Sequence, residues 1–324
     1  MEKSKGKIIS FDMLRIFACL SILMVHVAIF LPIQGKIGRI LETGSSGLNI
    51  FFVLSGFLNF ASLDTSTNLK KWYVKRLVRI IPIYYAILVA DIIVFECILG
   101  CVPKDPNGLG WLGYFLCLNK IVPPTELFWV SIGAVGSISI FVWFYLLAPL
   151  FHKFINKFER AVLFFVISYI AARVILSVTQ WGSAFTNFYY FGVGIVAYYA
   201  VKESKSRCTN IVGLIAIGAM ILLKTQGGLI YSFVIGLLMI NSHDFSCKYE
   251  KINFCTTLFS KITFCIYLAH GFVIEVLNRV YEGNMIGKVL YFSLGTVFIT
   301  LFLYCCVEQS VVKLVFQKNK STIC

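Results

Sequence analysis

The chain has 324 residues, of which 59% are hydrophobic and only 14% are charged, and its mean hydropathy is +0.84. A soluble globular protein is about 45–50% apolar and about 25% charged, so the composition excludes an ordinary water-facing surface. Apolar stretches long enough to cross ~30 Å of hydrocarbon recur from one end to the other. The sequence therefore predicts an all-α, polytopic membrane protein. We expect a single membrane domain over residues 1–324, with its core at 8–315 and a short cytoplasmic tail at 316–324.

The net charge of +14 does not point to nucleic acid. The basic residues form short clusters between apolar stretches, which is the pattern that the positive-inside rule predicts. Residues 1–7 are basic and precede an apolar run at 8–33, which is too long for a signal peptide and lacks an obvious cleavage site. This run is expected to stay in the protein as the first membrane helix.

Hydropathy predicts about ten membrane helices, several of which are short. The longest connection, at 101–128, is rich in proline and is expected to form an irregular loop that holds Cys101 and Cys117. A disulfide between these two cysteines is one option and free thiols are the other, because a sequence does not give connectivity. The predicted spans are 11–32, 46–63, 79–100, 129–151, 161–178, 187–201, 209–224, 227–241, 262–280 and 288–314.

The distribution of Lys and Arg predicts the orientation. With a cytoplasmic N-terminus, twenty of the 29 bases fall in internal segments, seven fall in external ones, and Arg15 and Arg173 lie within spans. Because basic loops stay on the cytoplasmic side, both termini are predicted to be cytoplasmic. An even number of spans agrees with this.

The first span contains Asp12, Arg15 and His26, and ionisable groups inside a span are costly and often functional. Arg15 and His26 are eleven positions apart, which places them within roughly 20° of one helix face and about 16 Å apart along the axis. Arginine can hold an anion but cannot act as a base, whereas histidine can accept a proton at neutral pH. The pair therefore points to catalysis, although a lone His in a span can also be a structural hydrogen-bonding group.

Two further clusters follow. The small residues at 44–47, and Ser55 and Gly56 in the second span, can serve close helix packing as well as catalysis. The basic run 70–79 contains Arg76 and Arg79, which are three residues apart and share a helix face. This run fits both a lipid-headgroup contact and a phosphate clamp.

Four segments taken in order resemble the motifs of the acyltransferase-3 family of integral-membrane acyltransferases. The first is an Arg followed after ten residues by His, the second is Phe-Phe-x-x-Ser-Gly-Phe, the third is Arg-x-x-Arg-x-x-Pro, and the last is Ile-Tyr-Leu-x-His. In this chain they correspond to Arg15 with His26, to 51–57 including Ser55, Gly56 and Phe57, to 76–82, and to 266–270 ending at His270.

The resemblance implies an acyl-CoA donor, most often acetyl-CoA, and a carbohydrate acceptor such as a surface polysaccharide or its lipid-linked precursor. It implies a multi-pass protein of the bacterial inner membrane with no tightly bound cofactor. His26 would be the essential histidine, acting as a general base or as a transient acyl acceptor. Arg15, Arg76 and Arg79 would serve the phosphates of the donor or the charge balance of the site. Asp12, the Ser-Gly-Phe motif and His270 would lie near the site in supporting roles.

The chain departs from the family at one place. Many members carry a Glu where this chain has Phe141 and Val142, and Asp91, Glu126 and Glu275 are acids that could replace it. No metal site is expected, because the four His are dispersed and two of them, His152 and His243, are predicted to lie in solvated loops. Two other functions stay open: a proton-coupled secondary transporter, and a catalytically silent acyltransferase-like protein. The oligomeric state is not indicated by the sequence.

Overall fold

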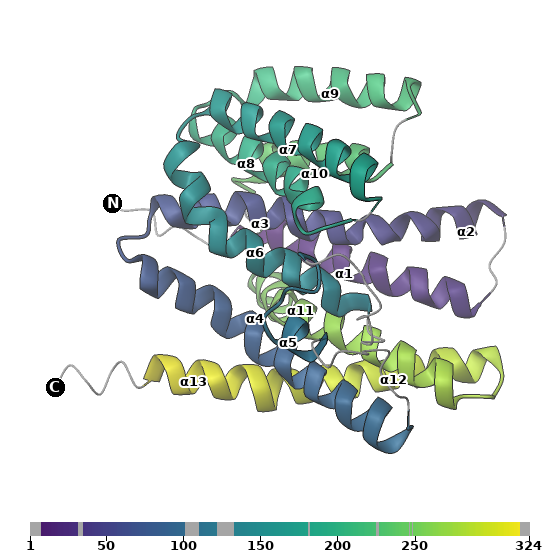
Figure 1. Cartoon of the computed structure of the whole chain (residues 1–324). Coiled ribbons are helices and arrows are strands. Elements are labelled where there is room, and N and C mark those ends of the chain that lie inside the picture. Colours follow the sequence, from purple (N-terminus) through teal and green to yellow (C-terminus); the bar gives the residue numbers. More distant parts are fainter. Residues whose placement is uncertain are drawn as a thin grey trace. The chain divides into compact units, whose positions relative to one another are not determined.

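The structure is a computed structural model of the chain and describes residues 8–31, 35–100, 110–121, 133–180, 182–224, 227–245, 247 and 249–317. Every regular element within these ranges is a helix (Figure 1). An all-helical architecture satisfies the backbone N–H and C=O groups within each segment, which a hydrocarbon environment requires. The predicted all-α membrane class is confirmed.

Over the described residues, seven helices are long and apolar enough to cross a membrane. Two shorter apolar helices, α9 (Ser206–Leu222) and α10 (Gly227–Ser242), fall where short spans were predicted, as does α8 (Phe188–Lys202). The total of ten spans and the cytoplasmic termini stay predictions. Residues 1–7 and 318–324 lie outside the described residues.

The chain contains two compact units, which we describe separately; the single-domain assignment stays a prediction. Unit 1 comprises Met1–Thr65, Leu150–Ala171 and Phe188–Thr263, and unit 2 comprises Ser66–Pro149, Ala172–Asn187 and Phe264–Cys324. Three long helices, α6 (Gly133–Phe154), α7 (Phe158–Thr179) and α11 (Glu250–Val280), contribute residues to both units.

Unit 1 is built on the contact between α8 and α3 (Gly47–Asp64). Two glycines permit this contact: a Cβ on Gly56 would lie 2.1 Å from the Phe191 carbonyl oxygen, and a Cβ on Gly194 would lie 1.9 Å from the Val53 carbonyl oxygen. The predicted packing role of Gly56 is thus realised, and its partner helix supplies a second glycine. Around α3 lie α1 (Ile9–Phe30), the 3₁₀ turn η1 (Thr43–Ser46) and α10, whereas α2 (Gly35–Glu42) packs against α1 and η1.

Unit 2 has its own apolar core. It includes the buried side chains of Ile83, Tyr84 and Leu88 from α4 (Leu69–Asp91), Val142 from α6, and Leu268 from α11. Its remaining elements are the π-helices η2 (Ile92–Ile98) and η4 (Leu303–Glu308), the 3₁₀ turn η3 (Phe185–Asn187), and the helices α5 (Gly110–Phe115), α12 (Met285–Phe302) and α13 (Gln309–Gln317).

The structure corrects several predicted helix ends. Helix α4 begins ten residues before the predicted span, because the Asn68 side chain accepts a hydrogen bond from the Lys71 amide at 2.9 Å and caps the helix there. Helix α11 likewise begins at Glu250, twelve residues early. Both early segments carry charged residues among apolar ones, and a helix can extend beyond the hydrocarbon because its backbone bonds are internal. The predicted loop at 101–128 contains α5, so its described part is not wholly irregular.

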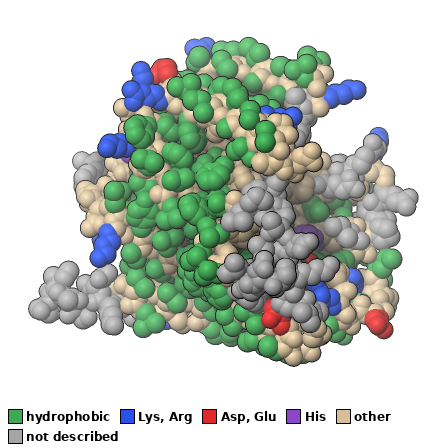
Figure 2. All heavy atoms as spheres, viewed as in Figure 1, with side chains coloured by type: hydrophobic (Ala, Val, Ile, Leu, Met, Phe, Trp, Pro, Cys, Tyr) green, Lys and Arg blue, Asp and Glu red, His purple; other side chains and the backbone are tan. Residues whose placement is uncertain are grey.

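The exposed side chains fit a membrane environment. On the face shown in Figure 2 they are predominantly hydrophobic, and few charged groups interrupt them. Helix α7, for example, exposes Leu163, Ile167, Ile170 and Val178, each by more than half of its surface. A water-facing helix of this kind would be an aggregation-prone patch, whereas a lipid-facing one needs no cover.

Candidate active site

At the start of α1, in unit 1, a carboxylate is held inside a small polar cluster. Asp12 is 1% exposed, and its Oδ1 accepts a hydrogen bond from Arg15 Nη1 at 2.7 Å and from Ser260 Oγ at 2.6 Å. Arg15 Nη1 is also 3.4 Å from Ser260 Oγ. Ser260 comes from α11, so the cluster joins α1 to a segment almost 250 positions away. Asp12 and Arg15, both named as candidate residues from the sequence, are therefore in direct contact.

Asp12 leaves part of the Arg15 guanidinium available. Only Nη1 takes part in these contacts, and the Arg15 side chain is 30% exposed. A guanidinium carries five donors in a rigid planar fork, so a fixed Nη1 orients the remaining donors. The arrangement can hold an anion or polarise a carbonyl oxygen, but it cannot accept a proton.

His26 lies further along the same helix. Helix α1 is continuous from Ile9 to Phe30, so the predicted common face of Arg15 and His26 follows from α-helical geometry. The His26 side chain is half-buried. The turn η1 packs closely against α1 in this region, because a Cβ on Gly44 of η1 would lie only 2.4 Å from the Ser21 carbonyl oxygen of α1. A half-buried imidazole can act as a base or nucleophile without full exposure to water.

The Ser-Gly-Phe motif packs beside this cluster rather than forming part of it. The Phe57 ring makes an edge contact with Phe11 at 4.9 Å and with Tyr198 at 5.5 Å. Phe11 directly precedes Asp12, so Phe57 packs against the helical turn that carries the buried carboxylate. The Ser55 carbonyl accepts a hydrogen bond from the Asn59 side chain at 2.7 Å. These contacts favour the supporting role predicted for Ser55.

Arg76 and Arg79 lie on α4, in unit 2. The Arg76 guanidinium lies 5.6 Å above the Trp72 ring, and Arg79 is exposed. Arg79 also exerts an electrostatic effect on Tyr304 of η4. Pro82 lies inside α4 and has no N–H, so the Val78 carbonyl loses its helical donor. The two arginines lie three residues apart on one continuous helix, and their role in binding phosphates stays a prediction.

The last motif is also in unit 2. His270 is 3% exposed, its ring lies 5.3 Å from the ring of Tyr267, and its Nδ1 is 3.3 Å from the Ile266 carbonyl oxygen. The Tyr267 hydroxyl is 2.9 Å from Ser137 Oγ on α6. The motif thus ties α11 to α6. The role of His270 in catalysis stays a prediction.

The two positions at which the resemblance led us to expect a Glu are occupied by buried apolar side chains. Phe141 and Val142 are 7% and 6% exposed, and Val142 belongs to the core of unit 2. Of the acids considered as replacements, Asp91 is 1% exposed and lies within electrostatic range of Glu96, Arg279 and Glu275. Glu126 lies outside the described residues.

Near these motifs, the sequence reasoning missed two residues and misplaced a third. Ser260 and Glu308 carry no periodic signal, yet Glu308 is 8% exposed and its Oε2 lies 3.5 Å from Cys265 Sγ. His152 was expected in a solvated loop, but it lies in the last turn of α6, where its Nε2 is 2.7 Å from Asp64 Oδ1. Asp64 also accepts hydrogen bonds from Tyr198 and Lys202.

The predicted residues therefore fall into two sets. Asp12, Arg15, His26 and the Ser-Gly-Phe motif belong to unit 1, whereas Arg76, Arg79 and His270 belong to unit 2. Among the described residues, no three His, Cys, Asp or Glu side chains lie close enough to hold a metal ion. Cys117 is buried, and Cys101, its suggested disulfide partner, lies outside the described residues.

The comparison with known families decides the identity. An acyltransferase domain matches residues 8–308, which is nearly the whole chain and includes all four motifs. The chain belongs to the acyltransferase-3 family. It is a multi-pass membrane acyltransferase, as the motifs and the apolar helices predict.

Relatives of this acyltransferase are distant. It is 26% identical over 308 residues to "Putative acetyltransferase ORF330" of the Acidianus two-tailed virus, covering 86% of this chain and 87% of the viral one. It is 26% identical to "Nodulation protein 10" of Rhizobium leguminosarum bv. viciae over 49% of this chain and 48% of that protein. It is 28% identical to "Acyltransferase MdmB" of Streptomyces mycarofaciens over 50% and 43%. No solved structure matches the chain significantly.

Proposed function

We propose that this acyltransferase moves an acetyl group from acetyl-CoA to a hydroxyl of a cell-surface polysaccharide or its lipid-linked precursor, in the bacterial inner membrane. The observation that carries the proposal is the fixed Arg15 on the helix that also bears His26. Family membership supports the acyl transfer, and a relative named as an acetyltransferase supports the acetyl group. The donor and the acceptor are the parts that experiment must establish.

In the proposed reaction, His26 removes the proton from the acceptor hydroxyl. The acceptor oxygen then bonds to the thioester carbonyl carbon, the carbon–sulfur bond breaks, and the CoA thiolate takes up the proton. Arg15, whose Nη1 is fixed by Asp12, offers its other donors to the negative charge that develops on the carbonyl oxygen or to the donor's phosphates. Arg76 and Arg79 bind phosphates of CoA.

A second route is transfer through His26 itself, in which the imidazole first forms an acyl-imidazole and the acceptor then attacks it. The two routes differ in one observable. Incubation with radiolabelled acetyl-CoA in the absence of acceptor labels the protein on the nucleophilic route and leaves it unlabelled on the general-base route.

The deciding experiment compares surface glycans from the native host with and without the gene by mass spectrometry. We expect loss of an acetyl mass increment in the deletion strain, and its return with the wild-type chain but not with His26→Ala. His243→Ala is the matched control, since His243 lies at the end of α10 beside Asp244 and outside the proposed site. An identical glycan profile in all strains would contradict the acceptor, and full activity of His26→Ala would contradict its role.

A further inference from the structure

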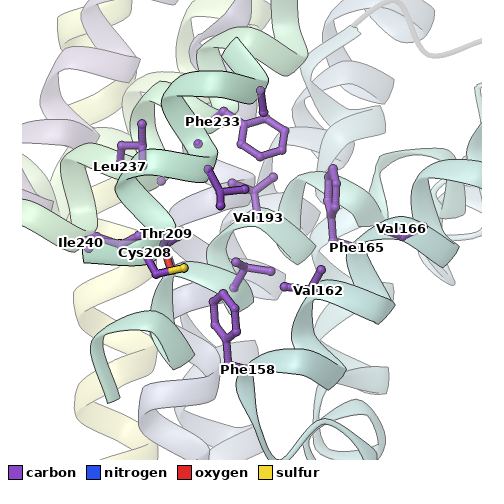
Figure 3. A pocket seen from close by; sticks show the side chains of 16 residues that line it. Phe158, Val162, Phe165, Val166, Val193, Cys208, Thr209, Phe233, Leu237 and Ile240 are labelled. Carbon is purple, nitrogen blue, oxygen red and sulfur yellow. The ribbon is translucent and has the colours of Figure 1, made fainter. Parts of the chain in front are cut away.

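Four helices of unit 1 enclose a pocket that the proposed reaction does not use. It has a volume of about 340 Å³ and is lined by residues of α7, α8, α9 and α10. Figure 3 shows Phe158 and Phe165 of α7 on one side and Leu237 and Ile240 of α10 on the other. All lining residues belong to unit 1, so the pocket is a property of that unit alone.

The side chains that line the pocket are almost all apolar, so they offer no hydrogen bonds to a water molecule. Thr209 is the only lining residue with a side-chain oxygen, and its hydroxyl donates to the Lys205 carbonyl within α9 at 2.9 Å. Cys208 supplies the only sulfur. Apolar cavities stay dry, and one of about 150 Å³ holds a benzene ring. A pocket about twice that size is suited to a length of hydrocarbon chain.

The pocket reaches the outer surface of the helices. Its lining residues Val166 and Val212 are 41% and 59% exposed on α7 and α9. In a protein whose apolar helices face lipid, this side opens onto hydrocarbon. Helix α9 has little packing of its own, because Gly213 is its only buried residue. A chain in the pocket would add the missing contacts between α9 and α7.

One end of the pocket lies beside a basic rim. Phe158 is the first residue of α7, Cys208 is the third of α9, and Ile240 is two residues from the end of α10. The segments 157–160 and 202–207 adjoin this end, and they hold five bases against two acids. Such an excess attracts anionic headgroups at a membrane surface.

Lys205 joins the two rim segments. Its ammonium lies 5.0 Å from the centre of the Phe158 ring, donates a hydrogen bond to Glu159, and lies 3.3 Å from Glu203. The hydrogen bond with Glu159 raises the pKa of Lys205 above its ordinary value, so the ammonium stays charged. Lys157, Arg160 and Arg207 belong to the same two segments and are exposed, and Arg160 Nη1 donates a hydrogen bond to the Phe154 carbonyl at 3.0 Å.

We propose that the pocket binds one acyl chain of an anionic phospholipid, with the lipid phosphate at the rim formed by Lys157, Arg160 and Arg207. The apolar wall selects the hydrocarbon, and the positive excess selects the headgroup charge. The bound lipid is a structural ligand that fills the space between α7 and α9. This proposal is independent of the acyl donor and acceptor, since none of the lining residues belongs to the proposed active site.

The test uses the full chain in vesicles of phosphatidylethanolamine that contain a trace of phosphatidylglycerol with a photoactivatable acyl chain. After illumination, mass spectrometry maps the labelled residues. We expect labelling of pocket residues on α7–α10 that exceeds, by about fivefold or more, the labelling by phosphatidylcholine with the same acyl chain. Equal labelling by the two lipids would overturn the proposal, because it would show only bulk contact with the bilayer. Absence of pocket labelling would overturn it as well.

Two sets of variants test the contribution of the apolar wall and that of the basic rim separately. Ala216→Trp fills the pocket and should abolish its labelling, whereas Gly218→Trp, on the same helix with no heavy atom within 4 Å of its Cβ position, should keep it. Should Ala216→Trp fail to fold, the rim variant Lys157→Gln with Arg207→Gln leaves the wall intact and should bring the two lipids to equal labelling. Persistent preference for phosphatidylglycerol in the rim variant would refute the headgroup site. Displacement of the label by an equal amount of a polyprenyl phosphate would refute a phospholipid as the occupant.

Discussion

Replacing Asp12 by Asn tests whether the buried carboxylate orients Arg15 for catalysis. The substitution keeps the shape of the side chain but removes the charge that accepts hydrogen bonds from Arg15 at 2.7 Å and Ser260 at 2.6 Å. A hydrogen bond to a charged group contributes about 1.5–3 kcal/mol and a neutral one about 0.5–1.5 kcal/mol. Each bond therefore weakens by about 1 kcal/mol, and solvent around the half-buried Arg15 reduces its share.

A total loss of about 1–2 kcal/mol corresponds to a factor of about 5–30. On the proposal that Arg15 contacts the acyl-CoA, we expect kcat/KM for the donor to fall by that factor, with a raised KM. The assay is release of CoA thiol by the purified protein in lipid nanodiscs. Asp244→Asn is the matched control, since the Asp244 side chain is 90% exposed, and it should behave as wild type.

Two results would refute this reasoning. An unchanged kcat/KM for Asp12→Asn would mean that the orientation of Arg15 does not depend on the carboxylate. A loss as complete as that of His26→Ala would mean that Asp12 takes part in the chemistry rather than in positioning. A thermal unfolding curve of the variant distinguishes either result from simple misfolding.

Three other substitutions test the packing of the two units, each by the midpoint of thermal unfolding in detergent. Gly194→Ala should destabilise unit 1 by at least about 1–3 kcal/mol, because the new Cβ would lie 1.9 Å from a backbone carbonyl oxygen of α3. Gly218→Ala, in open space inside α9, should stabilise by up to about 1 kcal/mol, and equal midpoints of the two variants would contradict the close approach. Tyr267→Phe should cost about 1 kcal/mol, and a double-mutant cycle with Ser137→Ala should return a coupling of that size rather than zero. Asp64→Ala should cost about 1–3 kcal/mol, because it removes the acceptor shared by a tyrosine, a lysine and a histidine; an unchanged midpoint would show that water replaces it.

Local sequence patterns predicted most of the helices because a membrane span carries its signal within about twenty consecutive residues. The same reasoning misplaced the start of α4, since the predicted span began only at 79, although lysines and arginines at the end of a span extend toward the headgroups from a continuous helix. It also placed His152 in a loop for this reason. Charge marks the membrane surface, but it does not mark the end of a helix.

Contacts between distant segments could not be predicted from the single sequence. The motif spacing placed Arg15 and His26 on one face, but nothing in it indicates that Ser260 completes the Asp12 cluster from 248 positions away. Gly56 was recognised as a packing residue, whereas its counterpart Gly194 was not, because a close approach between helices is a property of two surfaces. The motifs therefore identify candidate residues, and the folded chain identifies the residues that hold them.

Two buried acids of unit 2 lie at breaks in its helices, whereas Phe141 and Val142 occupy the positions at which the resemblance led us to expect a Glu. Asp91 directly precedes the π-helix η2, and Glu308 ends the π-helix η4. A π-turn inserts a residue into a helix and is frequently found at functional sites. It also shifts the register on which hydrophobic periodicity depends. A carboxylate at such a break is brought into the interior without any periodic signal, and the predicted spans 79–100 and 288–314 ran through both breaks without marking them. The described part of unit 2 thus holds buried carboxylates at both breaks, while Phe141 and Val142 contribute only apolar packing. Any carboxylate that unit 2 supplies to the reaction is therefore to be sought at these two breaks rather than at Phe141 and Val142 of α6.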